Sequence, residues 1–389
     1  MPEADPTLFP NEFGPTPTRA RHTTGILPSQ VIRAMAARHE IDTAEGPAVT
    51  EPQIQPASLD LRLGPVAHRI RASFLPGSSQ TVQSMIDRFG MHQIDLGPGA
   101  VLERGCVYVV PLLESLSLDR AVSGMANPKS STGRLDIFTR LITDHASEFD
   151  TVPKGYRGPL YAQISPGTFS ILVRTGTSLN QLRFRRGNPP MPDGPLRRLH
   201  DREGLVDTGD GAVDISGGVG ITADLAGDPQ TGLIGFRAKK HAGLIDFDRV
   251  AAYDPAEFWE PIHHDASREL ILDPGDFYIL VSKEAVSVPP DHAAEMRAYD
   301  TLVGEFRVHY AGFFDPGFGH SEAGGSGARA VLEVRSHDVP FVLEHRQTVG
   351  RLLYERLTEI PDRLYGRDIG STYQRQGLAL AKQFKRREA

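Results

Sequence analysis

Short apolar runs separated by glycine and proline dominate the hydrophobic pattern of this chain. Between Leu59 and Leu63, for example, leucine alternates with Asp60 and Arg62. Alternation of this kind predicts a strand with one buried face. Residues 31–40 instead have the spacing of a short helix, which Ser29 can cap. Because 39 glycines and 30 prolines punctuate the chain, the pattern predicts a mainly β protein with few short helices.

The chain repeats itself once, at a spacing of about 170 residues. Residues 105–118 (GCVYVVPLLESLSL) align with residues 275–288 (GDFYILVSKEAVSV). Further aligned pairs are Glu114 with Glu284, Met125 with Met296, Gly133 with Gly304, Gln163 with Glu333 and Phe169 with Phe341. Because solenoid repeats are much shorter, this spacing predicts an internal duplication that produced two tandem β domains.

The density of proline and glycine in residues 186–195 marks the connection between the two copies. The predicted organisation is an N-terminal arm at 1–22, a first domain at 23–186, a linker at 187–200 and a second domain at 201–389. Residues 194–261 carry no motif to which we assign a function.

Composition narrows the classes of function. The 42 basic and 49 acidic residues leave a net charge of −7, which argues against a general nucleic-acid binder but allows a small anionic ligand. The single cysteine, Cys106, excludes internal disulfides and multi-cysteine metal sites, and is typical of a reducing cytosol. The chain has no apolar run of bilayer length, and its N-terminus does not read as a signal peptide. We therefore expect a cytoplasmic protein without membrane partners.

Residues 129–135 (KSSTGRL) combine two cations, three hydroxyls and a glycine. Charge and free backbone N–H groups could let this stretch hold an oligophosphate, although a polar turn is the other interpretation. The second copy has Asp300 and Glu305 at the positions of Lys129 and Arg134. Since acidic side chains repel phosphate, we expect only the first copy to bind it.

Glu333 is the single carboxylate in the apolar, β-prone residues 330–334. Burial would raise its pKa and make it a candidate proton acceptor, whereas an edge-strand glutamate facing water is the alternative. The first copy has neutral Gln163 there, which cannot accept a proton from water at neutral pH. Each copy thus carries half of a site, which predicts one composite site at the junction of the two copies.

Taken in order, these stretches resemble the deoxycytidine triphosphate (dCTP) deaminase family, within the trimeric deoxyuridine triphosphatase (dUTPase) superfamily. The resemblance rests on residues 54–64, 129–135, 311–318, 330–334 and 373–377. It implies two dUTPase-like distorted β-barrel (β-clip) domains in a homo-oligomer with sites between neighbouring barrels. Whether the halves of a site come from one chain or from two stays open.

The resemblance also implies a reaction, the hydrolytic deamination of dCTP to dUTP and ammonia, which supplies dUTP for thymidylate synthesis. It implies that Glu333 is the general base that activates water against cytosine C4, and that Ser130 and Arg134 position this water. The substrate-binding residues that it implies are Lys129, Ser131, Val331, Tyr365 and Gln376. Thr372 stands where the family has lysine, and Arg375 is a candidate replacement.

No protein-bound cofactor is expected, and Mg²⁺ would arrive with the triphosphate. One cysteine is too few for the zinc-deaminase signature HxE with PCxxC. A dUTPase, or a deaminase that also cleaves dUTP, remains an alternative, with Asp315 as the candidate for activating water at the α-phosphate. A non-catalytic nucleotide-binding regulator on the same fold is a second alternative, which the intact Glu333 disfavours.

Overall fold

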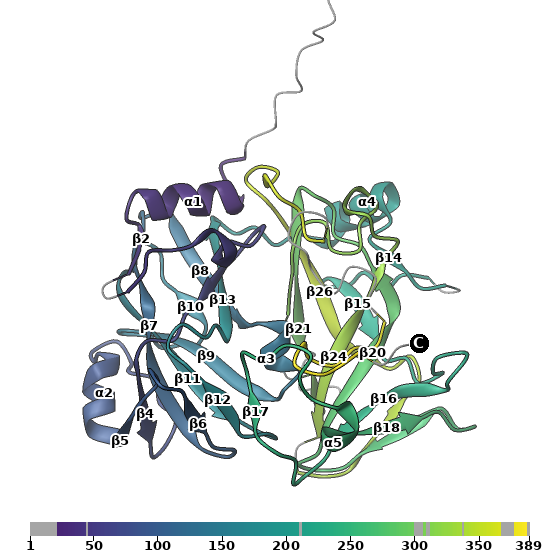
Figure 1. Ribbon diagram of the computed structural model, residues 1–389. Coiled ribbons are helices and arrows are strands. Elements are labelled where there is room, and N and C mark those ends of the chain that lie inside the picture. The colour runs from purple at the N-terminus through teal and green to yellow at the C-terminus, as the bar shows by residue number, and fades with distance from the viewer. Residues whose placement is uncertain are drawn as a thin grey trace, which may run out of the picture.

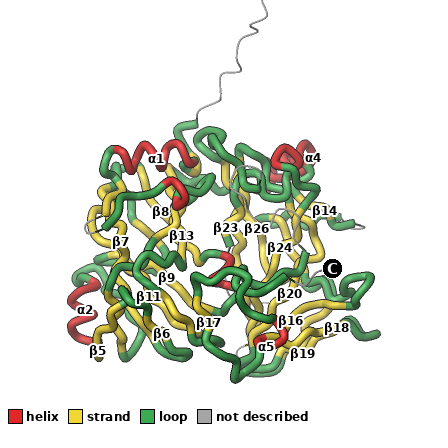
Figure 2. Tube along the Cα trace, viewed as in Figure 1, coloured by secondary structure: helices red, strands yellow, loops and turns green. Residues whose placement is uncertain are grey.

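The computed structural model describes residues 22–43, 46–209, 212–298, 306–308, 312–336, 338–366 and 377–386. In this part of the chain strand residues far outnumber helical ones, and the helices are short (Figure 1, Figure 2). The helices are α1 (Ser29–Ala37), α2 (Val82–Phe89), α3 (Ser130–Gly133), α4 (Asp193–Glu203) and α5 (Pro255–Phe258), with 3-10 turns at Glu51–Gln53 and Ser321–Ala323. The predicted mainly β fold with few short helices is confirmed.

Two sheets in the first half of the described chain follow the orders β1-β13-β8-β10, with β3 beside β13, and β5-β4-β7-β11-β9, with β2 beside β7. Their pairings are antiparallel, as expected for short strands joined by tight turns. The strands of this half are β1 (Gly25–Ile26), β2 (Ile41–Thr43), β3 (Leu59–Leu61), β4 (Val66–Ile70), β5 (Gly90–Asp95), β6 (Ala100–Leu102), β7 (Val107–Ser117), β8 (Val122–Pro128), β9 (Ile137–Thr143), β10 (Thr151–Val152), β11 (Arg157–Pro166), β12 (Ile171–Val173) and β13 (Asn180–Arg186).

In the second half, the larger sheets follow the orders β18-β16-β20-β24-β22, with β14 beside β20, and β15-β26-β21-β23. A two-stranded ribbon, β19-β25, completes this half in the described residues. The strands are β14 (Val206–Asp207), β15 (Val219–Thr222), β16 (Leu233–Ala238), β17 (Ile245–Asp246), β18 (Trp259–His263), β19 (Glu269–Leu272), β20 (Phe277–Val286), β21 (His292–Ala298), β22 (Phe306–Val308), β23 (Phe313–Phe314), β24 (Ala328–Ser336), β25 (Phe341–Glu344) and β26 (Thr348–Arg356).

The central strand pairs of the two halves have the same register. Gln163 of β11 lies opposite Val109 of β7, and Glu333 of β24 lies opposite Ile279 of β20. Both partners are therefore displaced by the same 170 residues as the aligned pair itself.

One aligned pair from the sequence shifts by a residue in the strands. Ala126 lies opposite Leu182, and Met296 lies opposite Leu352. If Leu182 and Leu352 correspond, Met296 corresponds to Ala126 and not to Met125. Aligning Met125 with Met296 because both are methionines gives a register that is wrong by one residue. Backbone pairing, and not residue type, sets which positions face each other in a sheet.

The two halves are joined by a shared core. β12 of the first half pairs in parallel with β17 of the second, so that one small sheet contains strands from both. The ring of Phe169 lies 5.5 Å from that of Trp259, whose ring lies 5.9 Å from that of Phe384 near the C-terminus. These buried rings belong to one apolar cluster, so burial of aromatic surface holds the halves together.

The structure has a helix where the sequence predicted a linker over 187–200. Helix α4 begins at Asp193, and its buried Leu196 and Leu199 pack into the core of the second half. Gly204 ends the helix with a left-handed φ of 63°, a conformation that glycine adopts without a Cβ penalty. The proline-rich pattern concealed this helix because proline is tolerated at the first turn.

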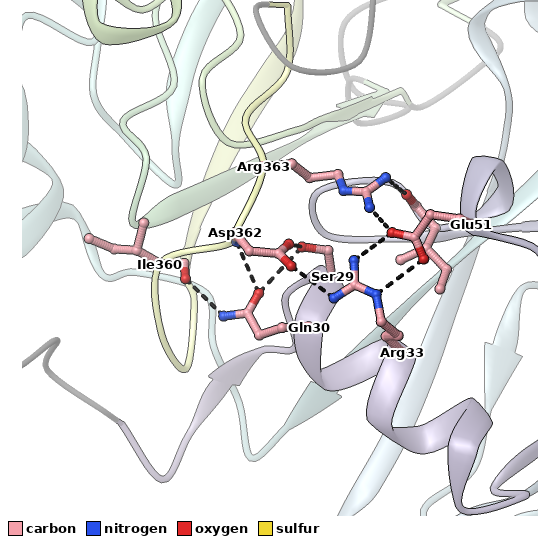
Figure 3. A network of polar contacts seen from close by, with 8 residues as sticks. Ser29, Gln30, Arg33, Glu51, Ile360, Asp362 and Arg363 are labelled. Atoms are coloured by element: carbon pink, nitrogen blue, oxygen red, sulfur yellow. Dashed lines mark hydrogen bonds and ion pairs between the residues drawn. The ribbon is translucent and has the colours of Figure 1, made fainter.

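A polar clasp ties α1 to residues 360–363 (Figure 3). Arg33 donates to Asp362 at 2.8 Å and to Glu51 at 2.6 Å, and Gln30 donates to the Ile360 carbonyl at 2.9 Å. Ser29, which the sequence predicted as a helix cap, is instead the first helical residue, and its hydroxyl donates to Asp362. The clasp holds the segment that leads to Tyr365 against the first half.

The alternating strand β3 is buried on both faces, not on one as the sequence predicted. Asp60 is 6% exposed and Arg62 is 7% exposed. Arg62 donates to the fully buried Glu114 at 2.7 Å, and Lys129 donates to Asp60. Charged side chains can be buried when each has such a partner, so alternation here does not indicate a solvent face.

Candidate active site

A cavity of about 210 Å³ lies between the two halves of the chain. Residues of the first half reach it from β8 and α3, and residues of the second half reach it from β23 and β24. A C-terminal segment, residues 377–386, contributes a further side chain, Lys382. In Figure 1, α3 lies at the centre of the molecule, where the two halves meet. Residues from both halves of the same chain thus line one cavity.

Helix α3 presents the cationic residues 129–135 to this cavity. Lys129 precedes the helix in extended conformation, and its N–H donates to the Leu179 carbonyl at 2.9 Å. Thr132 donates its hydroxyl to the same carbonyl at 2.7 Å. These bonds anchor the turn to the start of β13, so that Ser130 is exposed while Ser131 is buried. Lys129, Ser130 and Ser131 all line the cavity.

Arg134 follows α3 and is held by the C-terminal segment. It is 5% exposed, and its Nη1 donates to the carbonyls of Ala379 at 3.2 Å and Leu380 at 3.4 Å. A second contact fixes α3 against β24, because Arg335 pairs with Asp136 across the junction. The guanidinium of Arg134 is thereby placed in the cavity with little freedom.

Glu333 faces the same cavity from β24, which has β20 on one side and β22 on the other. It is 6% exposed, so the alternative of an edge-strand carboxylate facing water is wrong. Burial raises the pKa of Glu333 to about 7, and the positive charge of Arg134 opposes this rise only in part. A carboxyl group with this pKa can accept and return a proton near neutral pH.

Two further carboxylates border the cavity. Asp315 begins the turn after β23, is 7% exposed and accepts a hydrogen bond from Arg183 at 3.2 Å. Burial raises the pKa of Asp315, while the charge of Arg183 lowers it. Burial likewise raises the pKa of Asp60, against the effect of Lys129. The cavity therefore combines buried acids with closely placed cations, an arrangement that is common at catalytic sites.

The remaining predicted residues divide into two groups. Val331 of β24 and Tyr365 both line the cavity. The ring of Tyr365 lies 5.5 Å from the ring of Phe318, and its N–H donates to the Pro316 carbonyl at 2.9 Å. Gln376 lies outside the described residues, as do Thr372, Arg375, Asp300 and Glu305.

Three charged residues that line the cavity, Asp60, Arg329 and Lys382, were not among the predicted site residues. Asp60 lies inside the stretch that carried the family resemblance, so its position in that motif was an available signal. Lys382 had no such signal. It reaches the cavity because Gln383 donates to the Phe247 carbonyl at 2.8 Å and Phe384 packs into the core.

Within the described residues, no three His, Cys, Asp or Glu side chains are grouped so that they could hold a metal ion. The helices of this part of the chain are all too short or too polar to cross a membrane.

Two family models match this chain in tandem. The N-terminal domain of 2'-deoxycytidine 5'-triphosphate deaminase matches residues 23–188, and the C-terminal domain matches residues 192–384. The chain belongs to the dCTP deaminase family. Both matched regions contribute residues to the cavity, since α3 lies in the N-terminal match and β24 lies in the C-terminal one.

Individual dCTP deaminases resemble this chain to different extents. The crystal structure of 2'-deoxycytidine 5'-triphosphate deaminase from Agrobacterium tumefaciens is 55% identical, with a TM-score of 0.82, and the match covers 86% of this chain and all of that one. A "dCTP deaminase, dUMP-forming" of Halobacterium salinarum is 38% identical over 28% of this chain and 53% of its own length. Another of that description, from Beutenbergia cavernae, is 30% identical over 38% of this chain and 77% of its own.

Proposed function

We propose that this protein hydrolyses dCTP to dUTP and ammonia in the cavity between its two halves. The observation that carries the proposal is Glu333, a buried carboxyl group whose pKa is raised to about 7, in one cavity with Arg134 and the cationic stretch before it. General-base catalysis works best when the pKa of the base lies near the working pH. The similarity of this chain to the A. tumefaciens 2'-deoxycytidine 5'-triphosphate deaminase supports dCTP as the substrate.

The chemistry assigned to Glu333 is proton transfer. It takes a proton from water as the water oxygen attacks C4, and it passes that proton to N3. The remaining hydroxyl proton moves to the amino group, the C4–N4 bond breaks, and ammonia leaves. Arg134 and Ser130 hold the water and stabilise the developing charge; Arg134 is suited to this role because two backbone carbonyls fix its guanidinium.

The triphosphate is assigned to the cationic side of the cavity. Lys129 and Ser131 line it, and Lys382 adds a second ammonium group. Burial lowers the pKa of Lys382, and the neighbouring charge of Lys129 lowers it further, so that an incoming polyanion relieves the repulsion between the two cations. Mg²⁺ enters with the nucleotide, since it prefers phosphate oxygens.

The other predicted residues are assigned to the cytosine ring and to the phosphates. The backbone of Val331 reads the cytosine edge, because its strand borders the cavity beside Glu333. Tyr365 and Gln376 close over the phosphates, a role that rests on the family resemblance.

A second candidate function is the further cleavage of dUTP to dUMP and pyrophosphate. The relatives from H. salinarum and B. cavernae both carry the description "dUMP-forming". Asp315 is the residue to which we assign activation of water at the α-phosphate, because it is a buried carboxylate in the same cavity as Glu333.

Three broader properties belong to the same proposal. Each half is inferred to be a dUTPase-like distorted barrel (β-clip), which the equal registers of β7–β11 and β20–β24 support. Such barrels meet in threes in the superfamily, so we infer a homo-oligomer. The single cysteine supports a cytosolic location.

The test is incubation of the full chain with dCTP or with dUTP in the presence of Mg²⁺, followed by chromatography of the products. Formation of dUTP and ammonia from dCTP supports the deaminase, and dUMP with pyrophosphate supports the second candidate. Binding without turnover of either nucleotide would leave the non-catalytic regulator as the better description. Arg104→Gln is the matched control, since Arg104 is exposed and does not line the cavity.

A further inference from the structure

A second cavity, of about 290 Å³, lies at the other end of the strand β21. Met296 of β21 lines the catalytic cavity, whereas His292, the first residue of the strand, lines the second one. The two cavities share no lining residue. Helix α4, which forms one wall of the second cavity, lies at the edge of the molecule in Figure 1, away from α3 at the centre.

Three arginines line this second cavity. Arg198 and Arg202 project from one side of α4, one helical turn apart, and Arg356 comes from the end of β26. Like charges at this helical spacing destabilise a helix unless a counter-ion is present. Arg202 has one, because it donates to Glu203 at 2.7 Å. Arg198 and Arg356 have no acidic side-chain partner among the described residues.

His292 adds a buried polar group to the same cavity. It is 2% exposed, and its Nδ1 lies 2.6 Å from a carboxylate oxygen of Asp291. Burial alone would raise the pKa of Asp291, but the hydrogen bond and the charge of His292 outweigh it and lower that pKa. Asp291 is thus a hydrogen-bond acceptor that places the proton on Nδ1.

The second ring nitrogen of His292 has no partner. Its Nε2 is buried and makes no hydrogen bond within the part of the chain that the structure describes. Buried polar atoms are seldom left unsatisfied. With both ring nitrogens protonated, His292 would donate Nδ1–H to Asp291 and Nε2–H to an anion. The unsatisfied nitrogen and the two arginines without acidic partners therefore call for the same kind of ligand.

His22 and the Asp291 carboxylate also line the cavity, and the rest of its wall is apolar. Met191, Pro195 and Leu199 line it, the last two on the same side of α4 as the arginines. A ligand for this cavity would then have a phosphate group for the cationic wall and an apolar or aromatic part for the other wall. The volume is close to the lower end of the range for nucleotide-sized ligands, which is roughly 300 Å³.

We propose that this second cavity binds a phosphate-bearing small molecule of about nucleotide size, at a site separate from the catalytic one. Arg198, Arg356 and His292 contact the phosphate, and Leu199 contacts the apolar part.

The experiment is isothermal titration calorimetry of the full chain with pyrophosphate, at about 0.15 M salt. Two binding events are expected in the wild-type protein, one of them lost in Lys129→Ala. The other should weaken by roughly tenfold or more in the double variant Arg198→Gln/Arg356→Gln, since each substitution removes a charged hydrogen-bond donor to the phosphate. Both arginines are exposed, so these substitutions leave the core intact.

Arg104→Gln is the matched control for a general loss of positive charge. It should leave both binding events unchanged, and the double variant should keep wild-type turnover of dCTP. A single binding event that disappears with Lys129→Ala would overturn the proposal. So would a second event that survives the double variant, or one that Arg104→Gln weakens to the same extent.

Discussion

Gln163 and Glu333 occupy equivalent positions in the two halves, yet their surroundings differ. Both lie on a central strand in the same register, and both are almost fully buried. Ser73 donates its hydroxyl to the side-chain oxygen of Gln163 at 2.8 Å, so that this oxygen has its partner within its own half. Glu333 instead faces a cavity, and the cation whose charge lowers its pKa, Arg134, comes from the other half of the chain.

This difference shows that the strand position alone does not make a catalytic site. The strand supplies burial, which raises the pKa of a carboxyl group. The other half supplies α3 and its cations, which the position of Gln163 does not face.

The largest expected effect is on turnover in Glu333→Gln. Removal of a general base costs about 10²–10⁴-fold in rate, while the similar size of glutamine preserves nucleotide binding. Steady-state kinetics and a binding titration with dCTP measure both. The double variant Gln163→Glu/Glu333→Gln sharpens the comparison, because it moves the carboxylate to the equivalent strand. It should not regain activity, and recovery would mean that the strand position is sufficient.

The next effect is on stability. The pKa of Glu333 is about 7 in the folded protein, against an ordinary value of 4.5, so burial of the charge costs stability above pH 7. This cost shrinks as the pH falls from 7 to 4.5 and is absent below. Between pH 4.5 and pH 8, the free energy of unfolding of the wild type should therefore fall by about 3 kcal/mol relative to that of Glu333→Gln. Urea unfolding at both pH values measures this, and a pH-independent difference would contradict the assigned pKa.

A smaller effect is expected in the pH profile of the wild-type enzyme. Only the ionised form of Glu333 can accept a proton, so kcat/KM for dCTP should fall about tenfold per pH unit below pH 7. The residual activity of Glu333→Gln should lack this dependence. An acid limb near pH 4 would indicate a base that is not shifted by burial.

No effect is expected when two inactive variants are mixed. Arg134 and Glu333 line one cavity of a single chain, so a chain with either substitution lacks a complete site. Mixing Arg134→Ala with Glu333→Gln should give no more activity than the separate proteins. Differently tagged subunits would confirm that exchange has occurred, and recovered activity would place the two residues of one site on different chains.

The sequence alone determined the residue types of the site and the half from which each comes. The repeat at 170 residues, the exchange of Gln163 for Glu333 and the cationic stretch before Arg134 are all visible without a structure. Local patterns suffice for such features because strand alternation and turn chemistry act over a few residues. The resemblance to the dCTP deaminase family then supplied the roles.

Tertiary structure decided which of these residues meet, and which others join them. The alternation predicts that Asp60 lies on the polar face of a half-buried strand, but Asp60 is buried against Lys129, almost 70 residues away. Lys382 reaches the cavity only because the C-terminal segment packs against the core. The cationic cavity beside α4 joins residues of α4, β21 and β26. These contacts follow from packing between distant segments, which the periodicity of any one segment does not encode.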